Sequence, residues 1–222
     1  MIEFIKSVDL KKKYQVKGRF YVLINKKSIT KCRSLLTIED TTVTNKKKLL
    51  VIMLNPGSSR PLDNEYLETE ILVTKIDELN NLTLIDAKPD TTQYQIMRVM
   101  NELQFSYAHI INLYDVREPK SSFLLDNAKR GKLQVEASIF SNKRQSELNN
   151  YFTVDTTVIL AWGNVKPIIE IEKKAFVKIT KLTNKIFTVR GKNNIICHPS
   201  PQNHNFKLKW LDNICGQLRT LD

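Results

Sequence analysis

The order of apolar and polar positions along the chain predicts strands that alternate with helices. Apolar runs at 19–24 and 31–38 flank a polar turn at 25–28, a pattern typical of an antiparallel hairpin at a sheet edge. Further runs of strand length follow at 49–54, 108–116, 156–163, 185–190 and 195–197. Because helical segments lie between these runs, the pattern favours an α/β fold with a mainly parallel sheet.

The clearest helix is expected over residues 91–103. Ile96, Val99 and Met100 recur there at the spacing of three and four that places apolar side chains on one helix face, and Thr92 can cap the start. Other helical stretches are expected within 123–150, near 166–174 and over 206–218.

Three segments stay open. Residues 1–17 fit a short helix or a loosely docked arm, and 71–76 and 82–85 fit a strand or a helix equally well. We therefore expect a basic N-terminal arm and hairpin at 1–48, packed on an α/β unit at 49–222. Together they would form one globular body.

The composition restricts the class of protein. A chain of 222 residues can bury a substantial core, and no segment approaches the ~20 apolar residues of a membrane span. The first residues lack the order of a signal peptide, so we expect a cytoplasmic protein without membrane partners. The odd number of cysteines, Cys32, Cys197 and Cys215, argues against a disulfide framework and against a four-cysteine metal site.

Positive charge is concentrated at both ends of the chain. The net charge is +12, with 13 Lys and Arg against 4 acids in residues 1–50 and 11 against 4 in residues 160–222. The middle of the chain is slightly acidic. A basic surface of this kind is the footprint of a DNA-binding protein or of a partner for an acidic protein, although it also fits a solvated lysine-rich surface.

Two apolar runs end in a polar residue beside proline. Asn55-Pro-Gly follows 49–54, and His198-Pro-Ser-Pro follows 195–197. Ligands of open parallel sheets bind outside the carboxyl ends of the strands, so we expect both turns to face one crevice. The alternatives are an ordinary turn at Asn55 and a core histidine at His198. The chain has no Gly-x-Ser-x-Gly elbow, P-loop or dinucleotide fingerprint, and we expect no metal and no cofactor.

Four motifs, taken in order, resemble the uracil-DNA glycosylase superfamily. They are Met-Leu-Asn-Pro-Gly at 53–57, Ile-Asn-Leu-Tyr-Asp-Val-Arg at 111–117, Leu-Ala-Trp-Gly at 160–163 and His-Pro-Ser-Pro at 198–201. An uncharacterised bacterial and phage domain family with Met-Leu-Asn-Pro and His-Pro-Ser-Pro motifs is the closer match. The resemblance implies a three-layer sandwich around a mainly parallel four-stranded sheet, with the hairpin added.

The resemblance also implies roles for single residues. Asn55 would position a water molecule, His198 would hydrogen-bond the departing base, and Asn112 would read the edge of the base. Contacts to the base are further implied at Met53, Leu54 and Tyr66, and contacts to DNA phosphates at Ser58, Ser200 and Gln202.

The chemistry of these residue types indicates slow catalysis. A neutral imidazole can stabilise a departing base, but the Asn55 amide cannot accept a proton from water. Met53 replaces the usual glycine of the family, Leu54 replaces a polar residue, and Gln202 replaces an apolar wedge. We therefore expect a monomeric DNA-binding relative with weak or lost base excision. The alternatives are an active uracil or mismatch glycosylase, and a binder of an acidic inhibitor protein that imitates DNA.

Overall fold

The computed structural model describes residues 2–26, 28–43, 47–153 and 155–221 of the chain. Within these residues the strands form a mixed eight-stranded sheet in the order β4-β1-β2-β6-β3-β7-β8, with β5 paired to β1. The strands are β1 (Tyr14–Asn25), β2 (Ser28–Asp40), β3 (Lys48–Met53), β4 (Thr69–Leu72), β5 (Ile85–Asp86), β6 (Tyr107–Asn112), β7 (Thr157–Leu160) and β8 (Ile186–Phe187). The α/β class predicted from the sequence is confirmed.

Four neighbouring strands, β6, β3, β7 and β8, run parallel to one another. Met53 at the end of β3 lies opposite Asn112 at the end of β6, and Ile52 lies opposite Leu160 at the end of β7. The carboxyl ends of these strands therefore meet at one edge of the sheet, where the chain leaves β3 into the Asn55-Pro-Gly turn.

The hairpin of β1 and β2 is present, but its predicted position at the sheet edge is wrong. β2 pairs antiparallel with β6 and so joins the hairpin to the parallel strands, while β1 pairs with both β4 and β5. Segments 71–76 and 82–85, which the sequence left open, contribute to β4, to the 3₁₀ helix Val73–Asn81 and to β5. They cover β1, and the hairpin lies inside the sheet.

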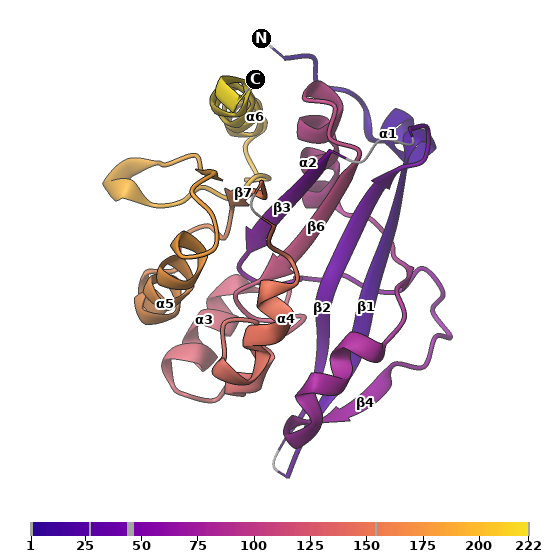
Figure 1. Ribbon diagram of the computed structural model, residues 1–222, viewed down its shortest axis with the longest axis vertical. Helices are drawn as coiled ribbons and strands as arrows, with labels where there is room; N and C mark the ends of the chain where they lie inside the picture. The colour runs from indigo at the N-terminus through magenta and orange to yellow at the C-terminus, as the bar shows by residue number, and fades with distance from the viewer. Residues whose placement is uncertain (1, 27, 44–46, 154, 222) are drawn as a thin grey trace.

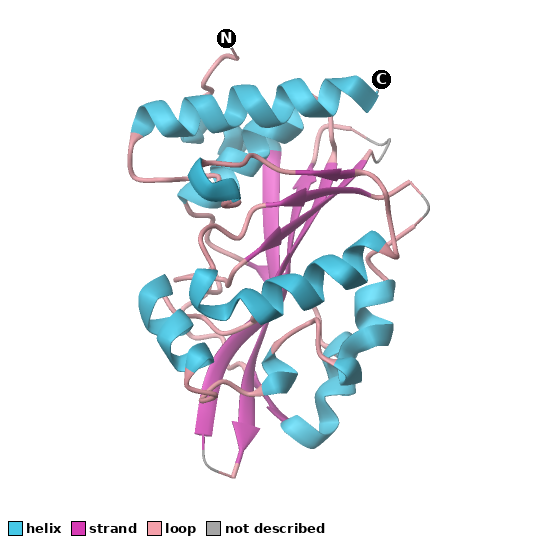
Figure 2. Ribbon diagram, turned by 90° about the vertical axis from the view of Figure 1, so that its left-hand side faces the viewer, coloured by secondary structure: helices cyan, strands magenta, loops and turns pink. Residues whose placement is uncertain are grey.

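Helices cover both faces of the sheet (Figures 1 and 2). The α-helices of the described residues are α1 (Ser7–Lys13), α2 (Thr91–Glu102), α3 (Ser121–Lys129), α4 (Gln145–Asn149), α5 (Ile169–Thr180) and α6 (His204–Leu218). Side chains of α2 and α6 share a core with one face of β3, whereas side chains of α3, α4 and α5 share a second core with the other face. None of the helices described is both long enough and apolar enough to cross a bilayer.

Two local predictions are wrong. The cap of α2 is Asp90 and not Thr92, because the Asp90 carboxylate accepts hydrogen bonds from the backbone N–H groups of Thr92 and Gln93. The predicted strand at 195–197 is a loop that makes one isolated bridge, between Arg190 and Ile196. Lys46, which belongs to the basic N-terminal segment 1–48, lies outside the residues that the structure describes.

Candidate functional site

A polar crevice lies at the carboxyl ends of β3 and β7. Its volume is about 540 Å³, within the range of small-molecule sites. Its walls include three segments far apart in the sequence: the end of β3 with the following turn, the start of α2, and the loop before α6. The residues predicted from the sequence that line it are Met53, Leu54, Asn55, Ser58, His198, Ser200 and Gln202.

The wall at the end of β3 is held by a hydrogen-bonded turn. Gly57 has φ +61°, a conformation that glycine adopts without steric cost, and Ser59 N–H donates to the Pro56 carbonyl. The Asn55 side-chain Nδ2 donates to the carbonyls of Val116 and Glu118, at 3.0 and 2.7 Å. Both of its N–H groups therefore hold the loop after β6. Asn55 acts as a clamp between two loops in this arrangement.

The wall at the start of α2 contributes a carboxylate that the sequence did not single out. Asp90 Oδ1 accepts from the N–H groups of Thr92 and Gln93 at 2.7 and 3.1 Å, and the Gln93 side chain accepts from Asp90 N–H. This capping box fixes the carboxylate against the helix start. Of the described residues lining the crevice, Asp90 is the one that carries a carboxylate. Asp-x-x-Gln before an apolar run is a capping signature that could have revealed it.

The third wall carries His198 at the mouth of the crevice. The loop before it doubles back, with Gly191 N–H donating to the Ile195 carbonyl and Cys197 N–H donating to the Val189 carbonyl. Ser200 N–H donates to His198 Nδ1 at 3.2 Å, so a neutral ring carries its proton on Nε2. Desolvation in the crevice lowers the pKa of His198 below its usual value, although the nearby Asp90 opposes this. At neutral pH His198 is therefore an uncharged donor.

A buried arginine also lines the crevice, and the sequence analysis missed it. Arg33 is 1 % exposed, and its Nε and Nη1 have no hydrogen-bond partner among the described residues. It lies in β2 opposite Phe20, where the register of β1 and β2 shifts by one residue. Desolvation lowers the pKa of Arg33 to about 10, while Asp90 and Asp115 raise it, so the guanidinium stays charged at neutral pH. The sequence offered one signal for Arg33, namely a charged residue inside an apolar strand.

Two residues predicted for the base pocket do not line the crevice. Asn112 ends β6 as predicted, but it is fully buried beside Met53, and its amide O and N have no partner among the described residues. Tyr66 borders a separate small cavity with Arg60 and Arg117. The structure therefore brings Asn55 and His198 together and leaves Asn112 below the crevice surface.

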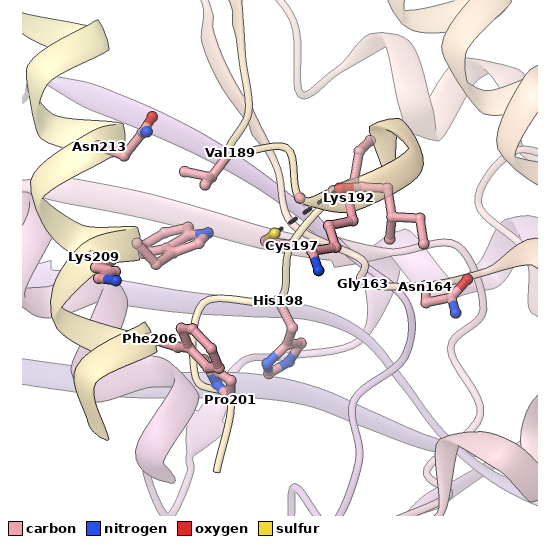
Figure 3. Close-up of a pocket in the computed structure, with 14 residues that line it drawn as sticks. Gly163, Asn164, Val189, Lys192, Cys197, His198, Pro201, Phe206, Lys209 and Asn213 are labelled. Atoms are coloured by element: carbon pink, nitrogen blue, oxygen red, sulfur yellow. Dashed lines mark hydrogen bonds between the residues drawn. The ribbon is translucent and has the colours of Figure 1, made fainter. Parts of the chain in front are cut away.

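A second, mostly apolar cavity of about 600 Å³ adjoins the crevice and shares Gly163, Asn164 and His198 with it. Figure 3 shows His198 beside Phe206 and Pro201, with Lys192 and Lys209 on opposite sides of the cavity. Phe206 is 58 % exposed. His198 borders both cavities.

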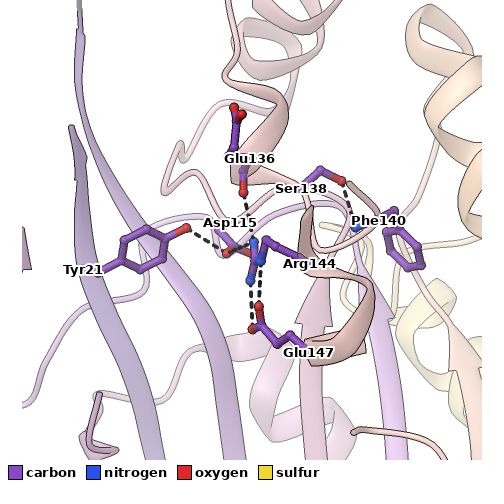
Figure 4. Close-up of polar contacts among 7 residues, drawn as sticks. All are labelled: Tyr21, Asp115, Glu136, Ser138, Phe140, Arg144 and Glu147. Carbon is purple, nitrogen blue, oxygen red and sulfur yellow. Dashed lines mark hydrogen bonds and ion pairs between the residues drawn. The ribbon is translucent and has the colours of Figure 1, made fainter. Parts of the chain in front are cut away.

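Behind the crevice lies a buried ionic cluster (Figure 4). Arg144 donates to Asp115 Oδ2 at 2.6 Å and to both carboxylate oxygens of Glu147 at 2.7 and 2.9 Å, and Tyr21 donates to the same oxygen of Asp115. Asp115 directly precedes the loop whose carbonyls Asn55 holds. The cluster therefore anchors one side of the crevice from within the core.

The described residues contain no group of three or more His, Cys, Asp or Glu side chains placed to hold a metal ion. The polar side chains on the crevice lining instead carry a guanidinium, a carboxylate, a neutral imidazole, amides and hydroxyls. These groups can bind a ligand that carries both hydrogen-bond acceptors and negative charge.

Comparison with known proteins corrects the expected resemblance. A model described as "Protein of unknown function (DUF1643)" matches residues 78–200, more than half of the chain, and no uracil-DNA glycosylase family is found. No curated protein and no solved structure matches. The matched segment includes Asp90 and His198 but not Arg33 or Asn55. The glycosylase kinship inferred from short motifs is therefore wrong, and the chain belongs to the DUF1643 family, whose function is unknown.

Proposed function

We propose that this protein binds DNA and holds one unpaired nucleotide in the crevice, with base excision weak or lost. The observation that carries the proposal is the convergence of Arg33, Asp90 and His198 on one cavity of nucleotide-compatible size. An unpaired base has its hydrogen-bonding edge free, so it suits a pocket with both donors and an acceptor. The His198 Nε2–H and the Arg33 guanidinium supply donors, and the Asp90 carboxylate supplies an acceptor.

The neighbouring cavity supports a nucleic-acid ligand. Phe206 is an exposed aromatic ring, and Lys192 and Lys209 border the same cavity. Single-stranded nucleic acid is bound by aromatic rings on which bases stack and by basic side chains that follow the phosphates. The net charge of +12 adds a long-range attraction for the DNA backbone. A strand with one nucleotide in the crevice can thus continue past His198 toward Phe206.

The same geometry argues for slow excision. Hydrolysis of the base–sugar bond benefits from a positioned water and a general base, the latter worth roughly 10² to 10⁴ in rate. Both N–H groups of Asn55 are used by backbone carbonyls, and an amide cannot accept the proton. Among the described residues Asp90 is left as the one carboxylate lining the crevice, and its Oδ1 already accepts two backbone hydrogen bonds. His198 can stabilise a departing base, but activation of water is weak.

Binding is tested by fluorescence anisotropy with single-stranded and duplex oligonucleotides over a salt series. If the protein contacts six to ten phosphates, affinity falls roughly 10³- to 10⁵-fold between 50 and 200 mM salt. His198→Ala should weaken binding of single strands, and His204→Ala, the same change at an exposed position outside the crevice lining, should not. Absent or salt-insensitive binding would refute the proposal. It would favour an acidic protein as the partner of the basic surface.

Excision is tested on oligonucleotides that carry uracil or a mismatched base, followed by alkaline cleavage of abasic sites. We expect little or no strand cleavage by wild type. Rapid cleavage that His198→Ala and Asp90→Asn abolish would instead make this protein an active DNA glycosylase.

A further inference from the structure

The Arg33 guanidinium is buried without a full set of hydrogen-bond partners. The side chain is 1 % exposed, and Nε and Nη1 have no hydrogen-bond partner among the described residues. Buried charges in proteins are normally paired, because an unpaired charge away from water destabilises the folded state. Arg144, the other arginine that is 1 % exposed, is paired with two carboxylates. The charges of Asp90 and Asp115 favour the guanidinium, but Arg33 has no hydrogen bond at Nε or Nη1, so its surroundings offset the cost of burial only in part.

Arg33 also forms part of the crevice lining. Arg33 lines the same cavity as His198 and Asp90, whereas Ser58, Asn164 and Gln202 on the lining are exposed. The guanidinium therefore lies below the rim, and a ligand that enters the crevice contacts it once the side chains that cover it move aside. A planar guanidinium presents N–H donors in a fork that matches the oxygens of a phosphate.

We propose that Arg33 is the anchor of a phosphate-monoester site, so that the nucleotide in the crevice is a strand end or a free nucleotide. A neutral base edge would satisfy hydrogen bonds but not charge, whereas a phosphate satisfies both. An internal phosphodiester needs room for a nucleotide on each side and so stays near the rim, while a terminal phosphate can descend to Arg33. The identity of this ligand rests on the proposed function, but the anion site itself does not.

Asp90 is the negative group that a phosphate would meet on the same lining. Its Oδ1 accepts from two backbone N–H groups at the start of α2, which partly offset its charge. The uncharged His198 opposite adds a donor and no repulsion. With the Asp90 charge partly offset in this way, Arg33 and His198 favour an anion over a cation.

The first experiment uses thermal unfolding in inorganic phosphate against chloride at equal ionic strength. We expect the Tm of wild type to rise with phosphate and the Tm of Arg33→Met not to respond. Arg60→Met, which removes an exposed guanidinium outside the crevice lining, should respond like wild type. Without phosphate, Arg33→Met should unfold at the same or a higher temperature than wild type, because a buried unpaired charge is gone.

Two results overturn the anion site. One is an equal phosphate response in wild type and Arg33→Met. The other is a Tm of Arg33→Met far below that of wild type in chloride, which would make Arg33 a support of the fold. Arg33→Lys keeps the charge and loses the fork, so it should fold and bind phosphate more weakly. An unchanged phosphate response in Arg33→Lys also counts against the site.

The second experiment separates the sources of the phosphate. Anisotropy competition compares oligonucleotides with a 5′-phosphate, a 3′-phosphate or neither, and a deoxynucleoside monophosphate with its nucleoside. A terminal or free phosphate should tighten binding about ten- to a hundredfold in wild type and not in Arg33→Met. Equal affinity with and without phosphate in every pair overturns the inference. Binding of the unphosphorylated strand reports the proposed function separately.

Discussion

Removal of Arg144 is expected to destabilise the fold severely. The Arg144→Met variant keeps most of the side-chain volume but leaves Asp115 and Glu147, both buried, without their cation. Breaking a buried pair in this way costs about 3–5 kcal/mol, a large part of the ~5–15 kcal/mol that holds a domain folded. For a chain of this size the loss corresponds to a fall in Tm of roughly 6–20 °C.

The assay is urea unfolding of wild type and Arg144→Met at pH 8 and pH 5, followed by circular dichroism. Burial raises the pKa of Asp115 to about 6, and without Arg144 its protonation becomes still easier. The loss of stability should therefore be smaller at pH 5, where the stranded carboxylate takes up a proton. The matched control is Arg130→Met, which breaks an exposed pair with Asp126 and should change stability by less than about 1 kcal/mol.

Two outcomes would refute this reasoning. A loss below about 1 kcal/mol for Arg144→Met would mean that the cluster is not a paired, desolvated unit. A loss that is equal at both pH values would mean that Asp115 does not respond as a buried acid.

Three further predictions concern single positions. In wild type the Asp115 pKa of about 6 lies above its unfolded value near 3.8. Asp115 therefore contributes about 3 kcal/mol of stability below pH ~4, and this contribution is lost as the pH rises through 6. Asp115→Asn should flatten this pH dependence in a pH series of urea unfolding midpoints. Burial lowers the pKa of His109 to about 4, so the contribution of His109 to stability is present above pH 6.5 and is lost as the pH falls toward 4. In thermal melts, the Tm of His109→Gln should therefore fall less at acid pH than the Tm of wild type. Asp90→Ala removes the cap of α2 and should cost about 0.5–2 kcal/mol, whereas Asp90→Asn should keep most of it; equal losses in urea unfolding would contradict the capping role.

The sequence predicted elements best where one short pattern determined them. The buried runs that became β3, β6 and β7 are read from apolar stretches bounded by turns, and α2 is read from its spacing of three and four. The run at 195–197 has the same appearance but forms a loop. Asn193 and Asn194 both take positive φ there, which turns the chain back on Val189 before a strand can extend.

The crevice was predicted in part, because strand ends are visible in a sequence and long-range packing is not. Asn55 and His198 follow apolar runs beside prolines, and both line the crevice. Arg33 lies on a strand that reads as an ordinary hairpin arm. The shift in register between Arg19 and Phe20, together with the pairing of β2 with β6, brings Arg33 to the cavity, and neither feature is written in local spacing.

The contrast between Arg33 and Arg144 links stability to function in this fold. Both guanidinium groups are 1 % exposed, so both have lost nearly all hydration. Arg144 recovers that loss through Asp115 and Glu147 and, by fixing Asp115, holds the loop whose carbonyls accept from Asn55. Arg33 recovers only part of that loss through the charges of Asp90 and Asp115, because its Nε and Nη1 have no hydrogen-bond partner among the described residues. Because a fold gains no stability from an unpaired buried charge, a ligand is the simplest compensation for Arg33, and the crevice is where that ligand can reach it.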